Sequence, residues 1–387
     1  MYKIIFYSES DIFGGHEKMA VAAHAAIKQH YDDVWIQWLV SKRNYKLQDA
    51  LDNAGLTYTA LGDAQAYSLW RNPFYALLMI CRNAATLRQL SPDLIMVVQG
   101  GIFLSFGGIL SARISRIRCC SYIPTVTCIS DTKAYRFPVL ANFLWSLLYK
   151  AMSSYITIDA DLGEKLHQKN HRASVFVVEN YVPKPELLDA QQCTKGTLGI
   201  SPGRSVLTMI GRIDFSNKCQ DWIVRVLRND PFLRDKFVLF VGDGSDAHAL
   251  QGMLGPDVQD RFRLIGWESD LRDVYAATDV LLIPSKSEGV PLVMLEALGY
   301  RIPVVGTDRD GMQSWLPVEW RFEWGDTEGL KHAIEQALTV TPPDMWDGIA
   351  ERLAQVHDEA RFAAQFSQAL IQYCKRRGTV QVITASA

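Results

Sequence analysis

Two glutamates in the segment 285–296, SKSEGVPLVMLE, have a spacing that suits ligand binding. Glu288 stands before a predicted helix, and Glu296 lies inside it. Eight residues at helical rise span about 12 Å, and less where the loop turns. The two carboxylates could therefore accept hydrogen bonds from hydroxyl groups at opposite ends of one extended ligand. The alternative is a strand–loop–helix unit with two solvated glutamates.

The start of the same predicted helix has the features of an anion site. The strand-like run VLLIP ends just before it, and Pro291 suits the first helical turn, where a missing N–H costs nothing. Gly289 allows a ligand to approach the backbone closely. The amides around Gly289, Val290 and Leu292, together with the helix dipole, then favour a bound anion.

A second candidate site follows the strand-like run SVLTMI, in the segment GRIDFSNKCQDW (211–222). Arg212 and Lys218 lie six residues apart across the expected strand–helix turn, so both can converge on one diphosphate. Arginine supplies a planar fork of donors and lysine a compact charge. Two such cations can neutralise a departing diphosphate without a metal ion. The alternative is a pair of surface cations, with Asp214 as a salt-bridge partner.

Glycine turns follow other strand-like runs. Gly14 and Gly15 come after the first run, and the segment VGDGSD contains Gly242 and Asp243. The second of these turns can place backbone groups near a nucleobase. Tight turns need glycine in any case, so these two signals are weaker than the glutamate and cation motifs.

The elements that would position these residues alternate along the whole chain. Stretches with helical periodicity separate runs of strand length, which are 3–8, 34–40, 94–98, 118–123, 155–158, 205–211, 237–242, 262–266, 280–284 and 302–306. Near-continuous apolar strands separated by helices imply parallel sheets covered on both faces. In such doubly wound sheets, ligands bind at the carboxyl ends of the strands.

A change of composition divides the chain into domains. Residues 184–204 are rich in Pro, Gly and polar side chains, which is typical of a linker. We therefore expect an α/β protein with an N-terminal Rossmann-like domain (1–183) and a C-terminal Rossmann-like domain (205–344). A helical stretch at 345–375 is long enough to pack back on the first domain, and 376–387 is expected to be a loose tail.

Composition excludes several classes of protein. The 387 residues, 48% of them hydrophobic and 21% charged, fit a globular protein of two domains. A net charge of −2 gives no global field that favours nucleic acid. The seven cysteines lack C-x-x-C pairs, which indicates reduced thiols in a cytosolic protein. The N-terminal run predicts a first strand and not a signal peptide. No apolar run reaches the roughly 18 residues of a membrane span.

The order of the motifs resembles family 4 of the retaining GT-B glycosyltransferases, known as glycosyl transferases group 1. Glu288 and Glu296 form its E-x7-E motif. Around it fall the Gly14-Gly15 loop, VVENYV (177–182), GR…K (211–218), VGDG (241–244), FRLIGW (262–267) and PVVGTDRDG (303–311). The resemblance covers nearly the whole chain and is tightest over 205–316. It implies a GT-B fold, in which two doubly wound parallel-sheet domains face a cleft and the second binds a nucleotide sugar.

The resemblance also implies roles for single residues. Glu288 would contact the donor sugar and Glu296 the ribose, while Arg212 and Lys218 would bind the pyrophosphate under the Gly15 loop. The implied catalytic residues are Arg212, Lys218 and Glu288. The implied donor-binding residues are Gly14, Gly15, Gly242, Asp243, Gly266, Gly289, Val290, Pro291, Leu292 and Glu296.

The implied reaction is a retaining, metal-independent transfer of a hexose from a nucleotide-diphosphate sugar of the UDP or GDP type. The acceptor would be a glycan or lipid-linked glycan in cell-surface polysaccharide or lipopolysaccharide synthesis, and no cofactor besides the donor substrate is implied. The sequence departs from the family pattern at Cys219 and at Asp310, where glycine is usual. Most members also carry a His where this chain has Thr127, and we do not take His16 as its replacement.

Two alternatives from other classes stay open. Asp159-Ala160-Asp161 forms a D-x-D after the strand-like run YITI, and such a pair could hold Mg or Mn in a metal-dependent transferase. The other interpretation of this pair is that Asp159 caps the following helix. A non-catalytic nucleotide-sugar-binding regulator is the second alternative, and a phosphorylase on the same fold is not excluded.

The segment 136–152, RFPVLANFLWSLLYKAM, raises the question of a membrane partner. It combines aromatic and aliphatic bulk with Arg136 and Lys150 at its ends. Such a helix can lie in a bilayer interface with anionic head groups. The alternative is a core helix of the first sheet. The sequence thus predicts a cytoplasmic protein, peripheral on the inner membrane face if the membrane interpretation holds.

Overall fold

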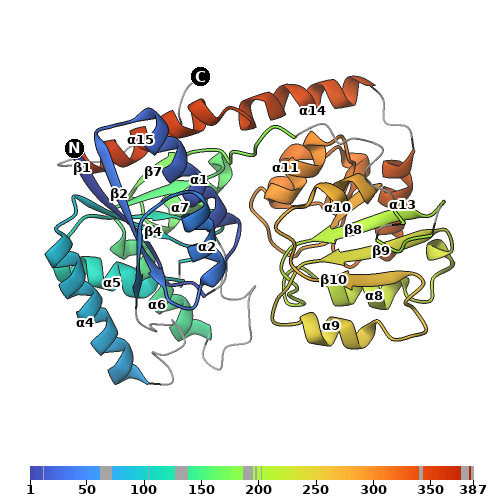
Figure 1. Cartoon of the computed structure of the whole chain (residues 1–387), viewed down its shortest axis with the longest axis horizontal. Helices are drawn as coiled ribbons and strands as arrows, with labels where there is room; N and C mark the ends of the chain where they lie inside the picture. Colours follow the sequence, from blue (N-terminus) through green and yellow to red (C-terminus); the bar gives the residue numbers. More distant parts are fainter. Residues whose placement is uncertain are drawn as a thin grey trace. The chain divides into compact units, whose positions relative to one another are not determined.

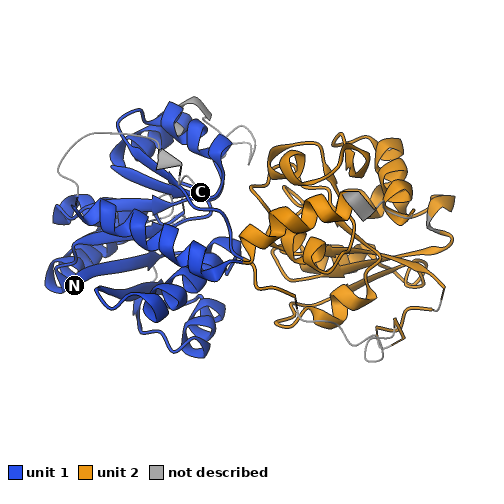
Figure 2. Ribbon diagram, turned by 90° about the horizontal axis from the view of Figure 1, so that it is seen from above, with its two compact units in different colours: residues 1–181, 358–387 blue, residues 182–357 orange. Residues whose placement is uncertain are grey.

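The computed structural model describes residues 1–11, 13–61, 72–102, 104–126, 138–185, 195–196, 198–201, 203–339, 343–375 and 383–384. The chain forms two compact units, which Figure 2 shows in different colours. Unit 1 comprises residues 1–181 and 358–387, and unit 2 comprises residues 182–357. Each unit is built around its own parallel sheet.

The sheet of unit 1 has the strand order β14-β7-β6-β5-β4-β1-β2-β3. Its strands are β1 (Tyr2–Ser8), β2 (Val34–Ser41), β3 (Tyr58–Leu61), β4 (Leu94–Val98), β5 (Cys119–Tyr122), β6 (Ser154–Thr157), β7 (Ser174–Val177) and β14 (Ile383–Thr384). Every residue of β4 is buried, as expected for an apolar strand covered on both faces. The strand order reverses between β1 and β4, so the carboxyl end of β1 lies at a topological switch point.

The helices of unit 1 pack against one another in two groups. The helices are α1 (Gly15–His30), α2 (Tyr45–Asn53), α4 (Pro73–Leu90), α5 (Phe106–Ser115), α6 (Pro138–Ala151), α7 (Ala160–Lys169) and α15 (Glu359–Lys375). Helix α1 packs against α2 and α15, whereas α4, α5, α6 and α7 pack in sequence (Figure 1). The Tyr373 hydroxyl of α15 donates to the Tyr155 carbonyl at 2.6 Å, which fixes the last helix on this unit.

The sheet of unit 2 has the strand order β10-β9-β8-β11-β12-β13. Its strands are β8 (Ser205–Ile210), β9 (Lys236–Val241), β10 (Phe262–Ile265), β11 (Val280–Ile283), β12 (Val304–Thr307) and β13 (Arg321–Phe322). The helices are α8 (Gln220–Leu227), α9 (Ala247–Met253), α10 (Arg272–Ala277), α11 (Leu292–Gly299), α12 (Asp310–Trp315), α13 (Thr327–Leu338) and α14 (Pro343–Val356), with 3-10 turns η2 (Pro231–Leu233) and η3 (Val318–Trp320). The order reverses between β8 and β11, which places the switch point of this sheet there.

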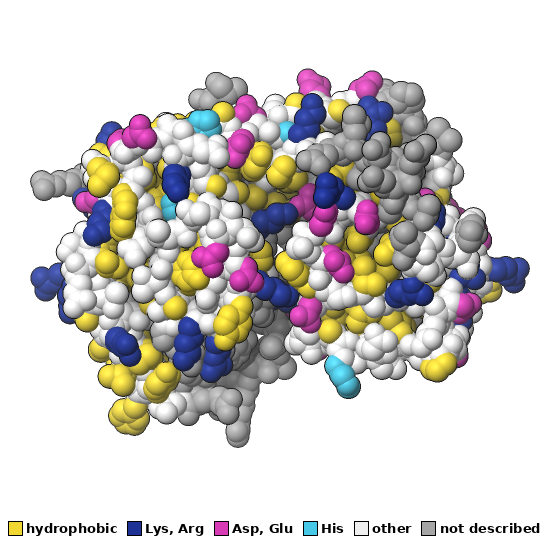
Figure 3. All heavy atoms as spheres, viewed as in Figure 1, with side chains coloured by type: hydrophobic (Ala, Val, Ile, Leu, Met, Phe, Trp, Pro, Cys, Tyr) yellow, Lys and Arg dark blue, Asp and Glu magenta, His cyan; other side chains and the backbone are white. Residues whose placement is uncertain are grey.

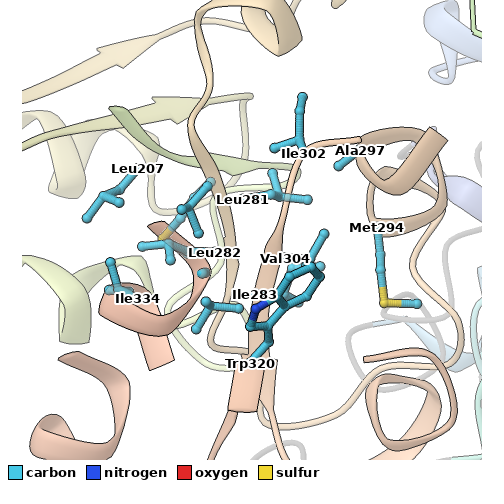
Figure 4. Packing of buried hydrophobic residues seen from close by; sticks show 14 of the residues in the cluster. Leu207, Leu281, Leu282, Ile283, Met294, Ala297, Ile302, Val304, Trp320 and Ile334 are labelled. Carbon is cyan, nitrogen blue, oxygen red and sulfur yellow. The ribbon is translucent and has the colours of Figure 1, made fainter. Parts of the chain in front are cut away.

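The core of unit 2 holds the central strands and α11 in place. Leu281, Leu282 and Ile283 of β11 are buried with Met294 of α11 and Trp320 (Figure 4). A large-to-small change in such a core costs about 2–5 kcal/mol, because the cavity collapses only partly. The loops at the carboxyl ends of β8 and β11 are therefore anchored on a rigid base.

The predicted strands at 3–8, 34–40, 94–98, 118–123, 155–158 and all five in unit 2 are confirmed within one or two residues. Strands β3, β7, β13 and β14 were not predicted, because they are short and lack a long apolar run. The helical stretch at 345–375 is two helices, of which α14 belongs to unit 2 and only α15 to unit 1. The expected loose tail contributes β14, which pairs with β7.

Candidate donor-binding site

The predicted cations and the first glutamate lie at the switch point of the unit 2 sheet. Arg212 and Lys218 follow β8, and Glu288 follows β11, which is the neighbouring strand. The carboxyl ends of parallel neighbours meet at the same edge of a sheet, so the two loops lie side by side. The structure thereby brings together two motifs that are about 70 residues apart in sequence.

Lys218 and Glu288 form an ion pair. The Lys218 Nζ contacts Glu288 Oε1, and both side chains are largely buried. A charge-assisted bond in such surroundings is stronger than an exposed one. The ammonium has three donors, so it can also reach a phosphate oxygen while it holds the carboxylate.

Asn217 joins the two loops that carry this pair. Its side-chain amide donates to the Ser287 carbonyl and accepts from the Ser287 N–H, both at 3.0 Å. The Lys286 N–H donates to the Asn217 carbonyl at 2.9 Å. These three bonds fix the register of the β8 loop against the β11 loop, immediately beside Lys218 and Glu288.

Arg212 is the more accessible of the two predicted cations. Its Nη2 lies 3.8 Å from Asp214 Oδ2, and 46% of its side chain is exposed. This contact matches the salt-bridge partner expected for the alternative interpretation, but an exposed pair at this distance stabilises by at most about 1 kcal/mol. The guanidinium therefore remains available to an anion.

The loop before α11 is held by Asp310, at one of the positions that departs from the family pattern. Asp310 has a left-handed backbone with φ 48°, and its carboxylate accepts from the Glu288 N–H at 3.2 Å. The Gly311 N–H donates to the Gly289 carbonyl at 3.1 Å. A side chain at Gly311 would approach that carbonyl to 2.1 Å, so glycine is required there.

The helix N-terminus differs slightly from the prediction. Helix α11 begins at Leu292, and Pro291 is its N-cap, not its first helical residue. Val290 and Leu292 are half-buried, and the orphan amides of the first turn lie beside the Glu288 loop. Gly289, Val290, Pro291 and Leu292 thus lie in the loop and first turn where the sequence predicts an anion site, with the helix starting one residue later.

Glu296 lies on α11 as predicted, and a tyrosine holds its carboxylate. The Tyr275 hydroxyl of α10 donates to Glu296 Oε2 at 2.7 Å. Burial, followed by the charge of Glu296, raises the pKa of Tyr275 well above its usual value. The phenol therefore stays protonated and acts as a donor.

The glycine turns after β9 and β10 support the β8 loop. Gly242 has φ 141°, and a side chain there would lie 2.0 Å from the Gly211 carbonyl oxygen. Its N–H donates to the Gly266 carbonyl at 3.0 Å, and the Asp243 carbonyl accepts from the Ile213 N–H at 3.0 Å. Gly242, Asp243 and Gly266 are therefore brought to the same sheet edge as Arg212.

The Gly14-Gly15 turn lies in unit 1, at the carboxyl end of β1. Glu17 is fully buried, and its Oε2 accepts from the Gly14 N–H at 2.9 Å, which is half of a capping box. The His16 Nε2 lies 2.8 Å from Glu17 Oε1. Gly15 is the first residue of α1. Glu17 thus fixes the turn locally.

A second buried acid, Glu9, also follows β1. Tyr7 donates to its Oε1 at 2.5 Å and the Gly107 N–H to its Oε2 at 3.1 Å. The Tyr7 hydroxyl accepts from Asn83 of α4 at 2.9 Å. Burial raises the pKa of Glu9 to about 7. No pattern in the sequence predicted an acid in the core at this position.

The D-x-D pair has an observed role at a helix end. Asp159 Oδ1 accepts from the N–H groups of Asp161 and Leu162, so Asp159 caps α7 as one interpretation predicted. Within the described ranges, no three His, Cys, Asp or Glu side chains gather as metal ligands. Thr127, in the position of the family's histidine, lies outside the described residues.

The two units define the GT-B fold, which confirms the predicted fold class. HepE from Anabaena, in complex with UDP and glucose, has the same fold with a TM-score of 0.75 and 16% identity, over 96% of this chain and 100% of that chain. WaaG, a glycosyltransferase involved in lipopolysaccharide biosynthesis, gives a TM-score of 0.65 at 14% identity, over 95% and 99%.

Residues 204–340 match the family of glycosyl transferases group 1, so the predicted resemblance is confirmed for unit 2. A D-inositol 3-phosphate glycosyltransferase of Actinosynnema mirum is 30% identical over 198 residues, 43% of this chain and 46% of the relative. An Escherichia coli UDP-Gal:alpha-D-GlcNAc-diphosphoundecaprenol alpha-1,3-galactosyltransferase is 29% identical over 30% of each chain. The matches span less than half the length of these relatives.

Sequence reasoning missed three residues that organise the site, namely Asn217, Tyr275 and Gln220. Gln220 donates to the Arg212 carbonyl at 2.9 Å and accepts from the Asp214 N–H at 3.2 Å, so it shapes the cation loop. Asn217 and Gln220 lie on either side of Lys218 in the predicted segment, and an amide side chain close to a predicted site cation was the available signal. Tyr275 lies on another helix, and nothing local in the sequence connects it to Glu296.

Proposed function

We propose that this chain is a retaining, metal-independent glycosyltransferase that moves a hexose from a nucleotide-diphosphate sugar to a glycan or lipid-linked glycan. The observation that carries the proposal is the Lys218–Glu288 pair, held at the switch point of a group 1 domain by Asn217. A cation and a carboxylate side by side suit the junction of a diphosphate and a sugar, because one binds phosphate and the other accepts hydroxyl hydrogen bonds.

The proposed roles follow from this geometry. Arg212 and Lys218 stabilise the negative charge that develops on the diphosphate as the bond between the sugar C1 and the phosphate oxygen breaks. The acceptor hydroxyl forms the new bond on the same face, and its proton passes to the departing nucleoside diphosphate. Glu288 orients the sugar, and Glu296 binds the ribose. The donor-binding role of Gly14 and Gly15, which lie in unit 1, stays a prediction.

A UDP- or GDP-sugar is the proposed donor class. HepE binds UDP and UDP-glucose, and the Escherichia coli relative is named for a UDP-galactose donor. A thermal-shift screen of UDP-, GDP- and ADP-sugars, followed by a transfer assay with the stabilising donor, tests the proposal. Binding without transfer or hydrolysis would favour the non-catalytic regulator.

Metal independence has a separate test. Two cations and a helix N-terminus supply positive charge at the proposed diphosphate site, and Asp159 already serves as a helix cap. We therefore expect activity to survive exhaustive EDTA treatment. Loss of activity that Mn restores, together with an inactive Asp159→Asn variant, would establish the metal-dependent alternative.

A peripheral membrane contact through 136–152 is also proposed, on the cytoplasmic face where lipid-linked glycans are assembled. Phe143, Leu144 and Leu147 of α6 are exposed, whereas Tyr149 is buried in the core of unit 1. Helix α6 thus has one inward and one exposed apolar side. Among the described residues, no helix has the length and apolar character needed to cross a bilayer.

Helix α4, which packs against α5, also exposes apolar side chains. Phe74, Leu77 and Leu78 are spaced i, i+3 and i+4 on α4, and Phe74 is 85% exposed. The segments 72–126 and 138–158 together contain six Lys and Arg but only one acid, Asp93. Figure 3 shows hydrophobic and basic side chains together at the lower left, where α4 lies in Figure 1. Apolar side chains among cations suit an anionic bilayer.

A further inference from the structure

The proposed ribose site contains a partner for Glu296 that no motif includes. Tyr275 is 3% exposed and lies on α10, the helix that leads into β11, while Glu296 lies on α11, the helix that follows it. The 2.7 Å bond between them is the contact of a buried phenol with a half-buried carboxylate. It links the helix before β11 to the helix after it, and Glu288 lies in the loop between β11 and that second helix.

Two further contacts limit how Tyr275 can move. Its ring stacks on that of Tyr300, with centroids 5.2 Å apart and 29° between the planes. Its backbone N–H donates to the Leu271 carbonyl at 2.8 Å, at the start of α10. A stacked and buried ring keeps one orientation, so its hydroxyl presents a fixed donor to Glu296.

The fixed Tyr275 hydroxyl determines where the Glu296 carboxylate lies. A glutamate has three rotatable side-chain bonds and loses considerable freedom when it binds a ligand. A carboxylate accepts about four hydrogen bonds, so a bond from a phenol is compatible with bonds from two ribose hydroxyls. If the carboxylate is oriented before the ligand arrives, less entropy is lost on binding.

We propose that Tyr275 is a positioning residue for the donor, which holds the Glu296 carboxylate in the orientation that accepts the ribose hydroxyls. The inference rests on the proposed function, because it takes Glu296 as the ribose ligand. It assigns Tyr275 no contact with the donor and no part in bond breaking. Its effect must therefore depend on both Glu296 and the ribose hydroxyls.

The test compares two ligands in four variants of the full chain. The probe is UDP or GDP, whichever the wild type binds more tightly, and its 2′,3′-dideoxy analogue, with affinities from calorimetry. The wild type should prefer the ribose form by about ten-fold or more, as expected for hydrogen bonds to a charged group. Tyr275→Phe should lower affinity for the ribose form about five-fold and leave the dideoxy affinity unchanged.

The other variants separate positioning from general stability. Glu296→Gln should reduce the preference for ribose, and adding Tyr275→Phe to it should cause no further loss. Thr278→Val is the matched control, because it removes a buried hydroxyl at the end of the same helix whose bonds go to Thr208 and Val274. It should leave the preference for ribose unchanged.

The possible failures are distinguishable. If Glu296→Gln keeps the full preference for ribose, Glu296 is not the ribose ligand and the proposed assignment fails. If Glu296→Gln loses the preference but Tyr275→Phe keeps it, the positioning role is overturned while the assignment stands. Equal weakening of both ligands by Tyr275→Phe would also overturn it, because that result indicates a purely structural role.

Discussion

The single ammonium group of Lys218 must serve two binding partners. It contacts the Glu288 carboxylate, and under the proposed function it also binds a phosphate oxygen. Asn217 and Asp310 hold the backbone of the loops that carry Lys218 and Glu288. These loops therefore need not rearrange when a sugar donor binds. Fixed donors and charges of this kind are the main electrostatic device of enzymes that stabilise a leaving group.

Removing either cation should slow transfer more than it weakens folding. We expect Arg212→Ala and Lys218→Ala each to lower kcat/KM by an amount equivalent to at least about 2–3 kcal/mol, because each loses a contact that strengthens as the diphosphate departs. Steady-state kinetics with the identified donor measure this. Arg225→Ala is the control, since Arg225 is an exposed cation that pairs with Asp221 on α8. Wild-type turnover in both site variants would refute the diphosphate assignment.

Substitution of the two glutamates should affect nucleotide binding and sugar transfer differently. Glu296→Gln should weaken free nucleoside diphosphate, since the ribose is present in that ligand. Glu288→Gln should spare free nucleotide and damage transfer, because it removes a sugar contact and also the carboxylate that shares Lys218. Titration of both variants with nucleoside diphosphate checks the division. Equal losses of affinity would contradict it.

At the scale of helices and strands, apolar runs predicted where the strands lie, but they did not predict which side chains contact one another. Run length and alternation were enough to place β1, β4 and β11, because a strand buried on both faces is apolar throughout. The positions of Glu288, Lys218 and Arg212 at one sheet edge followed from the strand-end rule. The Tyr275–Glu296 bond could not be predicted, because it depends on how α10 and α11 pack in space.

Buried polar residues at element ends were the other failure of sequence reasoning. The N-terminal run predicted β1, but no sequence pattern indicated that Glu9, which follows it, is buried between Tyr7 and Gly107. Gly107 explains this, since any side chain there would meet the Glu9 carboxylate at 2.3 Å. The acid fits only because the second residue of α5 is a glycine, and such a pairing across about 100 residues leaves no local pattern.

Glu9 gives unit 1 a stability that depends on pH. Its folded pKa of about 7 lies above the ordinary value of 4.5, so the folded protein binds the proton more tightly. Its contribution is fully present below pH 4.5 and is lost as the pH rises through 7, by roughly 3 kcal/mol in all. Unfolding midpoints between pH 4.5 and 8 should fall less steeply in Glu9→Gln than in the wild type. Glu164→Gln, at an exposed site on α7, is the control, and parallel curves for all three proteins would refute the assignment.

At the scale of the molecule, charge is distributed unevenly. The whole chain has a net charge of −2, yet its segments 72–126 and 138–158 together contain six Lys and Arg and one acid, a local charge of +5. Those segments include α4, α5 and α6, which pack in sequence and expose apolar side chains. Under the proposed membrane contact, a field of this sign would attract anionic lipid, and the apolar side chains would then insert.

Flotation with liposomes tests this surface directly. The full chain should float with vesicles that contain anionic lipid and less with purely zwitterionic vesicles, because cations and apolar insertion act together. Replacing Phe74, Leu77 and Leu78 with Ser, or Phe143 and Leu147 with Ser, should lower the bound fraction at least about ten-fold, since each inserted side chain contributes about 1 kcal/mol or more. Val318→Ser, which removes an exposed apolar side chain of unit 2, should bind as the wild type does. A wild-type chain that stays at the bottom of both gradients would end the membrane proposal, and free glycans would then become the acceptors to search.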